Sequence, residues 1–402
     1  MNPAMLLDRE IAPLVAEMTA WRRHFHQHPE LGFEEVETAA FVADRLRAWG
    51  IETHVGLGGT GVVGVIRGEE PAPGAAAPSI GLRADMDALP IEERGQAPHR
   101  SARPGLMHAC GHDGHTAMLL GAARILAGRR DFAGTVNLIF QPAEEGLGGA
   151  RAMIDAGLFE RFPCDAVFAL HNAPPLPLGT AAVHAGPACA GAARFQVEVR
   201  GRGGHAATPH LTASPISAAA ALVPLIEAIP ARRIQASGMA VVTIGSINGG
   251  DAFNVVPDAV TLTGTARAFD GATMQALEAE IRRCCSGVDR AHDVTCDMRF
   301  EILFPPTVNH AGEAGIAAAA LSEMLGHAAV IRDMPPVTGS EDFAYMLERL
   351  PGAYVLLGTG GTKDTPMLHS PDYDFEDRLL PIGASFFLKL VDLKLRTRRE
   401  PA

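Results

Sequence analysis

The segment His108–His115 contains three histidines, one cysteine and one aspartate within eight residues. Imidazole and thiolate groups are ligands for zinc and related transition metals, whereas sets of oxygen ligands alone suit magnesium or calcium. The two glycines in the segment allow sharp backbone turns, so that several side chains can converge on one point. The segment therefore predicts a metal site.

A second polar cluster, Glu144-Glu145-Gly146, follows the apolar run Val136–Phe140. Neighbouring side chains point to opposite faces of a regular strand. On an irregular bend, one carboxylate can bind metal while its neighbour reaches a water molecule. An acidic surface turn is the alternative for this cluster taken alone. Together with the first segment, it indicates a metal site with a carboxylate beside it, as in metal-dependent hydrolases.

Other candidates gain meaning only if they converge with these two clusters. Asp85 and Asp87 follow an apolar strand, at the end where α/β proteins place their sites, although a solvated turn would look the same. Asp87 could orient a metal-bound histidine. His171 follows an apolar strand, His369 lies in a loop, and His205 is flanked by small residues. Each histidine taken alone is more typical of a structural residue.

The glycine-rich segment Gly56–Gly61 matches the dinucleotide-binding pattern G-x-G-x-x-G. That pattern needs a strand before it and a helix after it, because the pyrophosphate binds at a helix N-terminus. Here the order is reversed, since a helical segment precedes it and the β-rich run Val62–Ile66 follows. We therefore expect a plain loop between a helix and a strand.

The composition is that of a globular protein, with 402 residues, 47% apolar residues and a formal net charge of −12. The negative charge argues against a protein that binds nucleic acid electrostatically. No apolar run approaches the roughly 20 residues that a membrane helix needs. The first ten residues lack the apolar core of a signal peptide, so the expected location is cytoplasmic. Six cysteines in this length do not make a disulfide scaffold.

The first and last parts of the chain read as one α/β domain. Apolar residues recur at steps of three and four from Leu7 to Phe25, and a second helical pattern runs from Val36 to Trp49. The segment Pro71–Pro78 reads as a surface loop. Short apolar runs predict strands of a largely buried sheet at Gly61–Ile66, Ile80–Ala84, Val136–Phe140, Ala166–Leu170 and Ala353–Gly358.

The middle of the chain has a different pattern of predicted elements. Its predicted elements are the strand Ala193–Arg200, the helix Ser214–Ile229, the strands Met239–Ile247 and Ala259–Ala268, the helix Met274–Cys285 and the strand Asp293–Phe300. This order is that of a ferredoxin-like α+β module with an antiparallel sheet. We expect residues 188–300 to form this inserted module, and residues 1–187 and 301–402 to form a discontinuous α/β domain.

The chain resembles the M20 family of metallo-amidohydrolases, in the branch of hippurate hydrolases, N-acyl-amino-acid amidohydrolases and plant auxin-conjugate hydrolases. The resemblance runs from Arg23–Gly32 to Leu368–Ser370, and the cysteine-containing motif and the paired glutamates are specific to this branch. It implies a zinc-exopeptidase-like catalytic domain with the inserted module as a lid. Where the wider family has His-x-Asp, this chain has Asp85 and Asp87, so Asp85 is not expected to be a ligand.

The resemblance also implies roles for individual residues. Glu144 falls at the position of the general base and Asp87 at that of a supporting aspartate. His205 matches a histidine that polarises the scissile carbonyl, and Asn254 and Arg267 match positions of substrate or lid contacts. His205 and Asn254 could act within their own subunit or on that of a partner. The implied ligands of two divalent metal ions (zinc, manganese, nickel or cobalt) are Cys110, His112, Glu145, His171 and His369.

The activity that the resemblance implies is hydrolysis of the amide bond of an N-acyl amino acid, hippurate-like or N-acetylated, to a carboxylate and a free amino acid. The expected partner is this small-molecule substrate, with assembly into a homodimer or homotetramer through the lid. A metal-dependent carboxypeptidase or dipeptidase and an auxin-conjugate hydrolase are alternatives within the family. Ser214 stands where relatives usually carry aspartate, and a serine can still cap the following helix.

Two other classes of function compete with this interpretation. Cys110 could be a nucleophile paired with His112 or His115, in which case activity would survive removal of metal. The clusters could instead form a structural metal site in a protein without activity. Structural zinc sites usually close with four protein ligands and need no free carboxylate, so Glu144 argues against this reading. His108, Asp113 and His115 are expected to shape the loop around the ligands.

Overall fold

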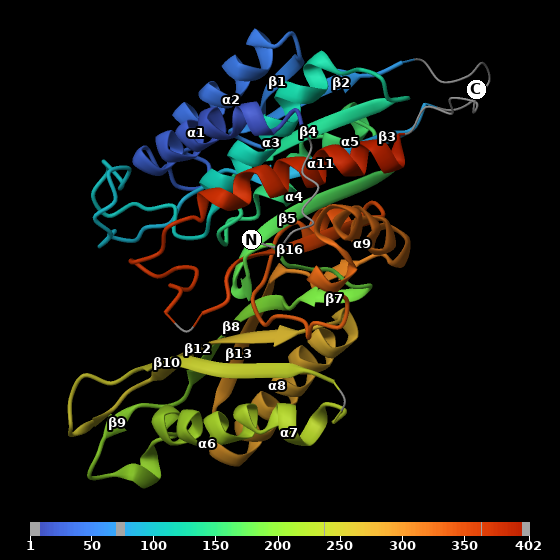
Figure 1. The fold of residues 1–402 in the computed structure, drawn as a ribbon. Coiled ribbons are helices and arrows are strands. Elements are labelled where there is room, and N and C mark those ends of the chain that lie inside the picture. The colour runs from blue at the N-terminus through green and yellow to red at the C-terminus, as the bar shows by residue number, and fades with distance from the viewer. Residues whose placement is uncertain (1–8, 70–76, 237, 363, 396–402) are drawn as a thin grey trace. The chain divides into compact units, whose positions relative to one another are not determined.

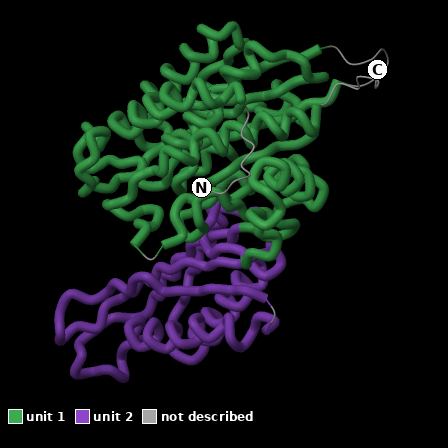
Figure 2. The backbone as a smooth tube through the Cα atoms, viewed as in Figure 1, with its two compact units in different colours: residues 1–188, 308–335, 342–402 green, residues 189–307, 336–341 purple. Residues whose placement is uncertain are grey.

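The computed structural model describes residues 9–69, 77–236, 238–362 and 364–395, and the chain folds as two units (Figures 1 and 2). Unit 1 comprises Met1–Ala188, Val308–Pro335 and Asp342–Ala402, and unit 2 comprises Cys189–Thr307 and Pro336–Glu341. The chain therefore passes between the units four times, after residues 188, 307, 335 and 341.

An eight-stranded sheet with the order β1-β2-β4-β3-β5-β16-β6-β15 runs through unit 1. The four neighbouring strands β4, β3, β5 and β16 are parallel, so their carboxyl ends lie along one edge. Six of the seven residues of β3 are buried, as expected where both faces of a parallel sheet are covered. The strands of this sheet are β1 (Glu52–Leu57), β2 (Gly61–Arg67), β3 (Ser79–Asp85), β4 (Thr135–Gln141), β5 (Ala166–Pro177), β6 (Ala181–Ala182), β15 (Val330–Ile331) and β16 (Gly352–Gly360).

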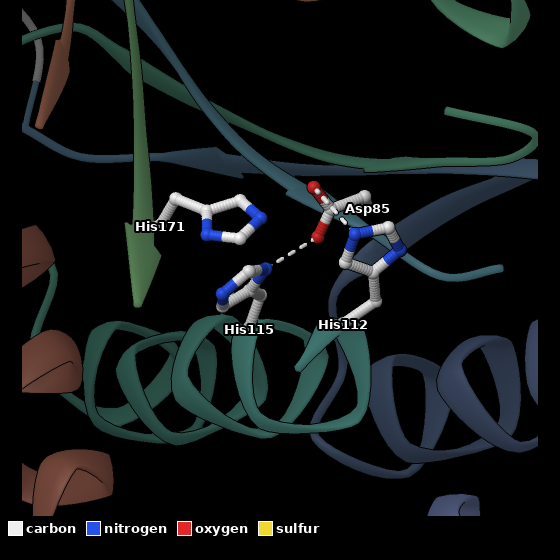
Figure 3. Close-up of side chains that lie close together, drawn as sticks. All are labelled: Asp85, His112, His115 and His171. Carbon is white, nitrogen blue, oxygen red and sulfur yellow. Dashed lines mark hydrogen bonds and ion pairs between the residues drawn. The ribbon is translucent and has the colours of Figure 1, made fainter. Parts of the chain in front are cut away.

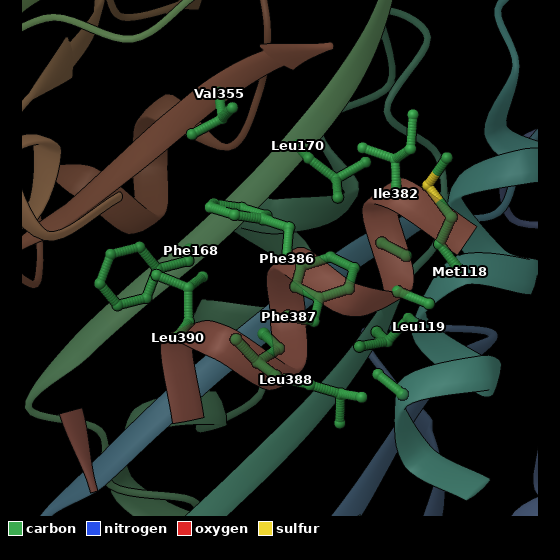
Figure 4. Packing of buried hydrophobic residues seen from close by; sticks show 14 of the residues in the cluster. Met118, Leu119, Phe168, Leu170, Val355, Ile382, Phe386, Phe387, Leu388 and Leu390 are labelled. Carbon is green, nitrogen blue, oxygen red and sulfur yellow. The ribbon is translucent and has the colours of Figure 1, made fainter. Parts of the chain in front are cut away.

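Helices α3 and α11 are the most deeply buried helices of unit 1, and they pack against each other. They are apolar nearly all round, which is typical of helices inside a core. Figure 4 shows Phe386 of α11 near Phe168 of β5, and Ile382 of α11 near Met118 of α3, all within one apolar core. The helices of unit 1 are η1 (Ala12–Leu14), α1 (Val15–Gln27), α2 (Val36–Ala48), α3 (His112–Gly128), α4 (Gly149–Asp155), α5 (Leu158–Arg161), α9 (Ala311–Leu325), η3 (His327–Ala329), α10 (Ala344–Leu347), η4 (Asp377–Leu379) and α11 (Leu380–Lys394).

Unit 2 contains an antiparallel four-stranded sheet with the order β10-β12-β8-β13. Along the chain its elements run strand, helix, strand, strand, helix, strand, which is the predicted ferredoxin-like arrangement. The elements are β8 (Gly191–Arg200), β9 (Gly204–His205), η2 (Pro209–Leu211), α6 (Pro215–Glu227), α7 (Ile229–Arg233), β10 (Ala240–Asn248), β11 (Val255–Val256), β12 (Ala259–Ala268), α8 (Gly271–His292) and β13 (Thr295–Phe304), and the chain passes between the units through β7 (Gly186–Cys189) and β14 (Thr307–Asn309).

The interpretation of Gly56–Gly61 as a loop between a helix and a strand was wrong. The segment is the turn of a hairpin, because β1 precedes it and pairs antiparallel with β2. Strand β1 was missed because it is largely exposed and carries polar residues, so its apolar alternation is weak. The segment still does not lead into a helix, as nucleotide binding by this motif would require.

Several predicted segments differ in detail from the structure. Leu7 and most of the predicted loop Pro71–Pro78 lie outside the described residues. The helix expected at Met274–Cys285 is longer, because Asp270 caps its start by accepting a hydrogen bond from Thr273 N at 2.7 Å. In the described part of the chain, no helix is long and apolar enough to cross a membrane.

Candidate metal centre

The metal-binding segment predicted from the sequence lies at the start of helix α3. Cys110 precedes the helix and His112 is its first residue. Gly111 between them has a φ of 96°, and a Cβ atom at this position would overlap Asn172 Oδ1. A side chain at position 111 would therefore be both strained and blocked. The glycine lets the chain turn so that Cys110 and His112 face the same region.

The five predicted ligands converge within unit 1, although they come from four separate segments of the chain. Cys110 Sγ lies 3.4 Å from His171 Nε2, and Glu145 Oε1 lies 3.1 Å from His369 Nε2. One ligand atom from each of Cys110, Glu145 and His369 lies within 4.8 Å of the others. Cys110, His112 and His171 are buried, whereas the side chain of His369 is 52% exposed.

Glu144 lies beside this cluster and is itself buried. Its carboxylate forms a second group with His112 and Glu145, in which one atom of each residue lies within 4.8 Å of the others. Glu144 Oε1 accepts a hydrogen bond of 3.4 Å from the backbone N–H of Asp342. The two glutamates on the bend therefore both reach the cluster.

Asp87 connects two of the predicted ligands. His112 Nδ1 lies 2.9 Å from the carbonyl oxygen of Asp87 and 3.2 Å from its Oδ1. Since a carbonyl can only accept, Nδ1 carries the proton and Nε2 is left with its lone pair for a metal ion. Nε2 is buried and has no hydrogen-bond partner among the described residues. Asp87 Oδ2 also accepts from Glu145 N at 2.9 Å, so one carboxylate orients both residues.

His171 is oriented in the same way. Its Nδ1 donates to the carbonyl oxygen of Asn172 at 2.8 Å, which leaves Nε2 facing Cys110 Sγ. His171 lies on β5, one of the parallel strands whose carboxyl ends meet at this edge of the sheet. His171 therefore lies beside Cys110, which directly precedes α3.

Asp85 and His115 lie close to the cluster but are already bonded to each other (Figure 3). His115 Nδ1 lies 2.6 Å from Asp85 Oδ1, and His115 Nε2 lies 2.7 Å from Asn172 Oδ1. Asp85 Oδ2 accepts from Arg83 Nη1 at 2.7 Å. Asp85, His112, His115 and His171 are close enough to form a further candidate metal group. The existing hydrogen bonds of Asp85 and His115 favour the other ligand set.

His369 reaches the cluster through a strained backbone. Its φ is 64°, a left-handed conformation that few residues other than glycine adopt. Its backbone N–H donates to the carbonyl oxygen of Ala109 at 2.8 Å, next to Cys110. Such strain persists only where the surroundings fix it, and it clusters at functional sites.

The charges of the cluster fit a cation. Burial, followed by the charge of Glu145, raises the pKa of Cys110 well above its usual value. A thiolate ligand at this position therefore needs a positive charge against Sγ. Glu144, Glu145 and Asp87 add carboxylates around the same point, and the donors mix sulfur, nitrogen and oxygen. This set suits a divalent transition metal.

The buried residues behind the cluster were not found by sequence reasoning. Arg83 is fully buried at the end of β3, and Asn172 bonds both His115 and the hydroxyl of Tyr373, the latter at 2.7 Å. A charged residue inside an otherwise apolar strand was the one available signal for Arg83. Asn172 follows His171 directly, but nothing in the sequence marked it.

The other three predicted residues belong to unit 2. His205 lies on β9, is exposed, and accepts a hydrogen bond from Ala207 N at its Nδ1. The backbone of Asn254 accepts from Ala206 N at 3.0 Å, and Asn254 is exposed as well. Arg267 Nη1 donates to the carbonyl oxygen of Thr338 and to Ser340 Oγ. Unit 2 thus places His205 and Asn254 close together, and it uses Arg267 for a contact within the unit.

Comparison with known proteins identifies the family. The model of "Peptidase family M20/M25/M40" matches residues 81–393. The chain belongs to this family. Hippurate hydrolase of Campylobacter jejuni is 40% identical to this M20 chain over 389 residues, which cover 96% of this chain and 98% of the relative. N-acetyl-L-cysteine deacetylase of Bacillus subtilis is 38% identical over 395 residues, covering 96% of this chain and 91% of the relative.

A solved structure supports the same conclusion. The YXEP protein of Bacillus subtilis, described as a dinuclear metal-binding peptidase of the M20 family, superimposes with a TM-score of 0.83 at 33% identity. The match covers 96% of this chain and 99% of that chain. This M20 protein is therefore a hydrolytic enzyme acting on amides, with a zinc-exopeptidase-like domain, an inserted α+β domain and a site for divalent metal.

Proposed function

We propose that this enzyme hydrolyses the amide bond of N-acyl amino acids and releases a carboxylate and a free amino acid. The observation that carries the proposal is the placement of buried Glu144 beside the cluster of Cys110, His112 and Glu145. The names of two relatives add the substrate class, since hippurate and N-acetyl-L-cysteine are both N-acyl amino acids. Hippurate-like and N-acetylated amino acids are therefore the first substrates to test.

The proposed cofactor is a pair of divalent ions, drawn from zinc, manganese, nickel and cobalt. When bound, such ions lower the pKa of a water molecule and polarise a carbonyl group. Two overlapping groups of donors support a pair of ions, because Cys110, Glu145 and His369 form one group while His112 forms another with Glu144 and Glu145. The proposed ligands are Cys110, His112, Glu145, His171 and His369.

Glu144 is the proposed general base and acid. Its carboxylate takes a proton from the attacking water and then delivers that proton to the nitrogen of the leaving amine. The carboxylate is buried, so it is shielded from bulk water during both transfers. Asp87 supports it from the neighbouring position, because it bonds Glu145 N and His112 Nδ1 and so fixes the bend and the first turn of α3.

Unit 2 is the proposed lid and supplies the proposed substrate contacts. His205 donates to the oxygen of the scissile carbonyl as negative charge develops there. Asn254 lies beside it, since Ala206 N bonds its carbonyl oxygen, and is a proposed substrate contact together with Arg267. We further propose assembly into a homodimer or homotetramer through unit 2, in which His205 and Asn254 serve either their own subunit or that of the partner.

The proposed location is cytoplasmic. All six cysteines are free, and none of Cys110, Cys164 and Cys285 is exposed. Free cysteines of this kind are typical of proteins in a reducing compartment. Cys110 would lose its role as a ligand if it were held in a disulfide.

The decisive experiment measures activity and metal content on the same sample. The purified enzyme is stripped with a chelator, reloaded with zinc, manganese, nickel or cobalt, and assayed on N-benzoyl, N-acetyl and indole-acyl amino acids and on dipeptides. We expect no turnover after stripping and recovery on N-acyl amino acids after reloading. Full activity of the stripped enzyme would favour Cys110 as a nucleophile instead, and inactivity of the loaded enzyme on every substrate would contradict the proposal.

A further inference from the structure

The loop that carries both glutamates has to be held in a fixed shape. It connects the end of β4 at Gln141 to the start of α4 at Gly149. Ala143 has a φ of 53°, so the loop is strained just before Glu144. A Cβ atom at position 149 would overlap the carbonyl oxygen of Pro142, which shows how closely the two ends of the loop approach each other. Connecting loops are more mobile than the elements that they join unless other groups fix them.

Asp342 contacts the residues at both ends of this loop and Glu144 within it. Its Oδ1 accepts a hydrogen bond from Gln141 Nε2 at 2.7 Å, just before the loop. Its Oδ2 accepts from Ala150 N at 2.8 Å, just after the loop. Its backbone N–H donates to Glu144 Oε1 at 3.4 Å. One buried residue therefore contacts both ends of the loop and the carboxylate in the middle.

Arg83 holds Asp342 in turn. The side chains of both residues are completely buried. Arg83 Nη2 donates to Asp342 Oδ1 at 3.2 Å, and Arg83 Nε donates to Gln141 Oε1 at 2.8 Å. The remaining nitrogen, Nη1, donates to Asp85 Oδ2. A buried carboxylate persists only when it is paired and hydrogen bonded, and here one guanidinium compensates two of them.

We propose that Asp342 is a positioning residue that fixes the Glu144–Glu145 loop, and that Arg83 keeps Asp342 in place. The proposal rests on the proposed function, because it takes Glu144 as the group that moves the proton. In this proposal Asp342 acts through Glu144 and not on the substrate itself. Its contribution is to limit the carboxylate of Glu144 to the geometry in which proton transfer is fast, since small displacements of a catalytic group lower the rate strongly.

The test is the variant Asp342→Asn, with kcat, KM, metal content and unfolding temperature measured together. An amide cannot accept at both of its atoms, so the bond to Ala150 N or the bond to Gln141 is lost. We expect kcat to fall about 10- to 100-fold, as for other residues that orient a site from behind, with KM and metal content within twofold of wild type. The result that overturns the proposal is a wild-type kcat, or a fall in kcat that the metal content explains.

Two further variants guard against a merely structural effect. Asp377→Asn is the matched control, because Asp377 also pairs with a buried arginine, Arg22, at 2.7 Å but has no contact with the glutamate loop among the described residues. We expect it to lower the unfolding temperature and to leave kcat unchanged. Gln141→Met removes the hydrogen bond to Asp342 Oδ1 and the acceptor of Arg83 Nε, but it leaves Arg83 Nη2 paired with Asp342. We expect a several-fold fall in kcat from it. Equal kcat losses in Asp377→Asn and Asp342→Asn would contradict the proposal.

A double variant separates this proposal from the proposed function. If Asp342 acts through Glu144, adding Asp342→Asn to Glu144→Gln costs no additional rate, because the group being positioned is already lost. Multiplicative losses would show that Asp342 acts elsewhere and would overturn the positioning role alone. Wild-type turnover of Glu144→Gln by itself would overturn the proposed base, and the positioning role with it.

Discussion

The metal cluster of unit 1 differs in its construction from the region of unit 2 around His205, which comprises β9, β11 and Asn254 and is called the tip below. In the cluster, His112 is buried and its Nδ1 is hydrogen bonded to Asp87. This bond fixes the orientation of the imidazole ring, and therefore the direction in which Nε2 points. In unit 2, His205 is exposed and lies on the two-residue strand β9, which pairs with β11, where His205 is opposite Val255. The difference indicates that the cluster is preorganised, whereas the exposed imidazole of His205 is held among the described residues by the hydrogen bond from Ala207 N.

The largest effect is expected inside the cluster, from Glu144→Gln. The amide has the shape of the carboxylate but cannot take a proton from water. We expect kcat to fall on the order of 10²- to 10⁴-fold, with metal content unchanged because Glu144 is not among the proposed ligands. Turnover and metal stoichiometry of the same preparation check this. Near-normal turnover would remove Glu144 from the mechanism.

A somewhat smaller effect is expected at the tip of unit 2, from His205→Ala. Loss of one group that stabilises an oxyanion typically lowers the rate on the order of 10²- to 10³-fold. We expect this fall in kcat without any change in metal content or unfolding temperature, because His205 is exposed. His210→Ala, another exposed histidine of unit 2, is the matched control. Equal activities of the two variants would mean that the tip takes no part in the reaction.

A third effect tests whether Asp87 preorganises the cluster. In Asp87→Asn, the amide cannot accept from both His112 Nδ1 and Glu145 N. We expect metal affinity to fall about 10- to 100-fold, as measured by competition with a chelator. Activity should recover at high metal concentration, which distinguishes a weakened site from a damaged fold. Unchanged affinity would show that the ligands hold their positions without Asp87.

The smallest effect concerns the stability of unit 2. Ser214 caps α6, since its Oγ accepts from Ser217 N at 3.3 Å. Replacement of such a cap by alanine lowers the free energy of unfolding by about 1 kcal/mol. We expect Ser214→Ala to show this loss in denaturant unfolding, with unchanged kcat, while Ser217→Ala keeps the cap because it keeps the backbone N–H. A large fall in kcat for Ser214→Ala would mean that turnover depends on the start of α6 as well as on the region around His205.

The sequence predicted those parts of the molecule whose signal is local. The segment around Cys110 and the paired glutamates stood out by residue type, and the strands of the buried sheet stood out as short apolar runs. His369 could be assigned only through the resemblance to the family, because a single loop histidine carries no signal. Arg83 and Asp342 were missed, since their importance lies in pairing between residues 259 positions apart in the chain. Strand β1 was missed because an exposed edge strand lacks apolar alternation.

The return of residues 336–341 to unit 2 has a consequence for protein engineering. Arg267 of β12 is bonded to Thr338 and Ser340, which lie in this short second segment. A chimera that exchanged only Cys189–Thr307 between two relatives would join an arginine from one parent to acceptors from the other. The exchangeable piece is therefore the pair of segments, and a successful transplant has to carry both, with the second junction placed directly before Asp342.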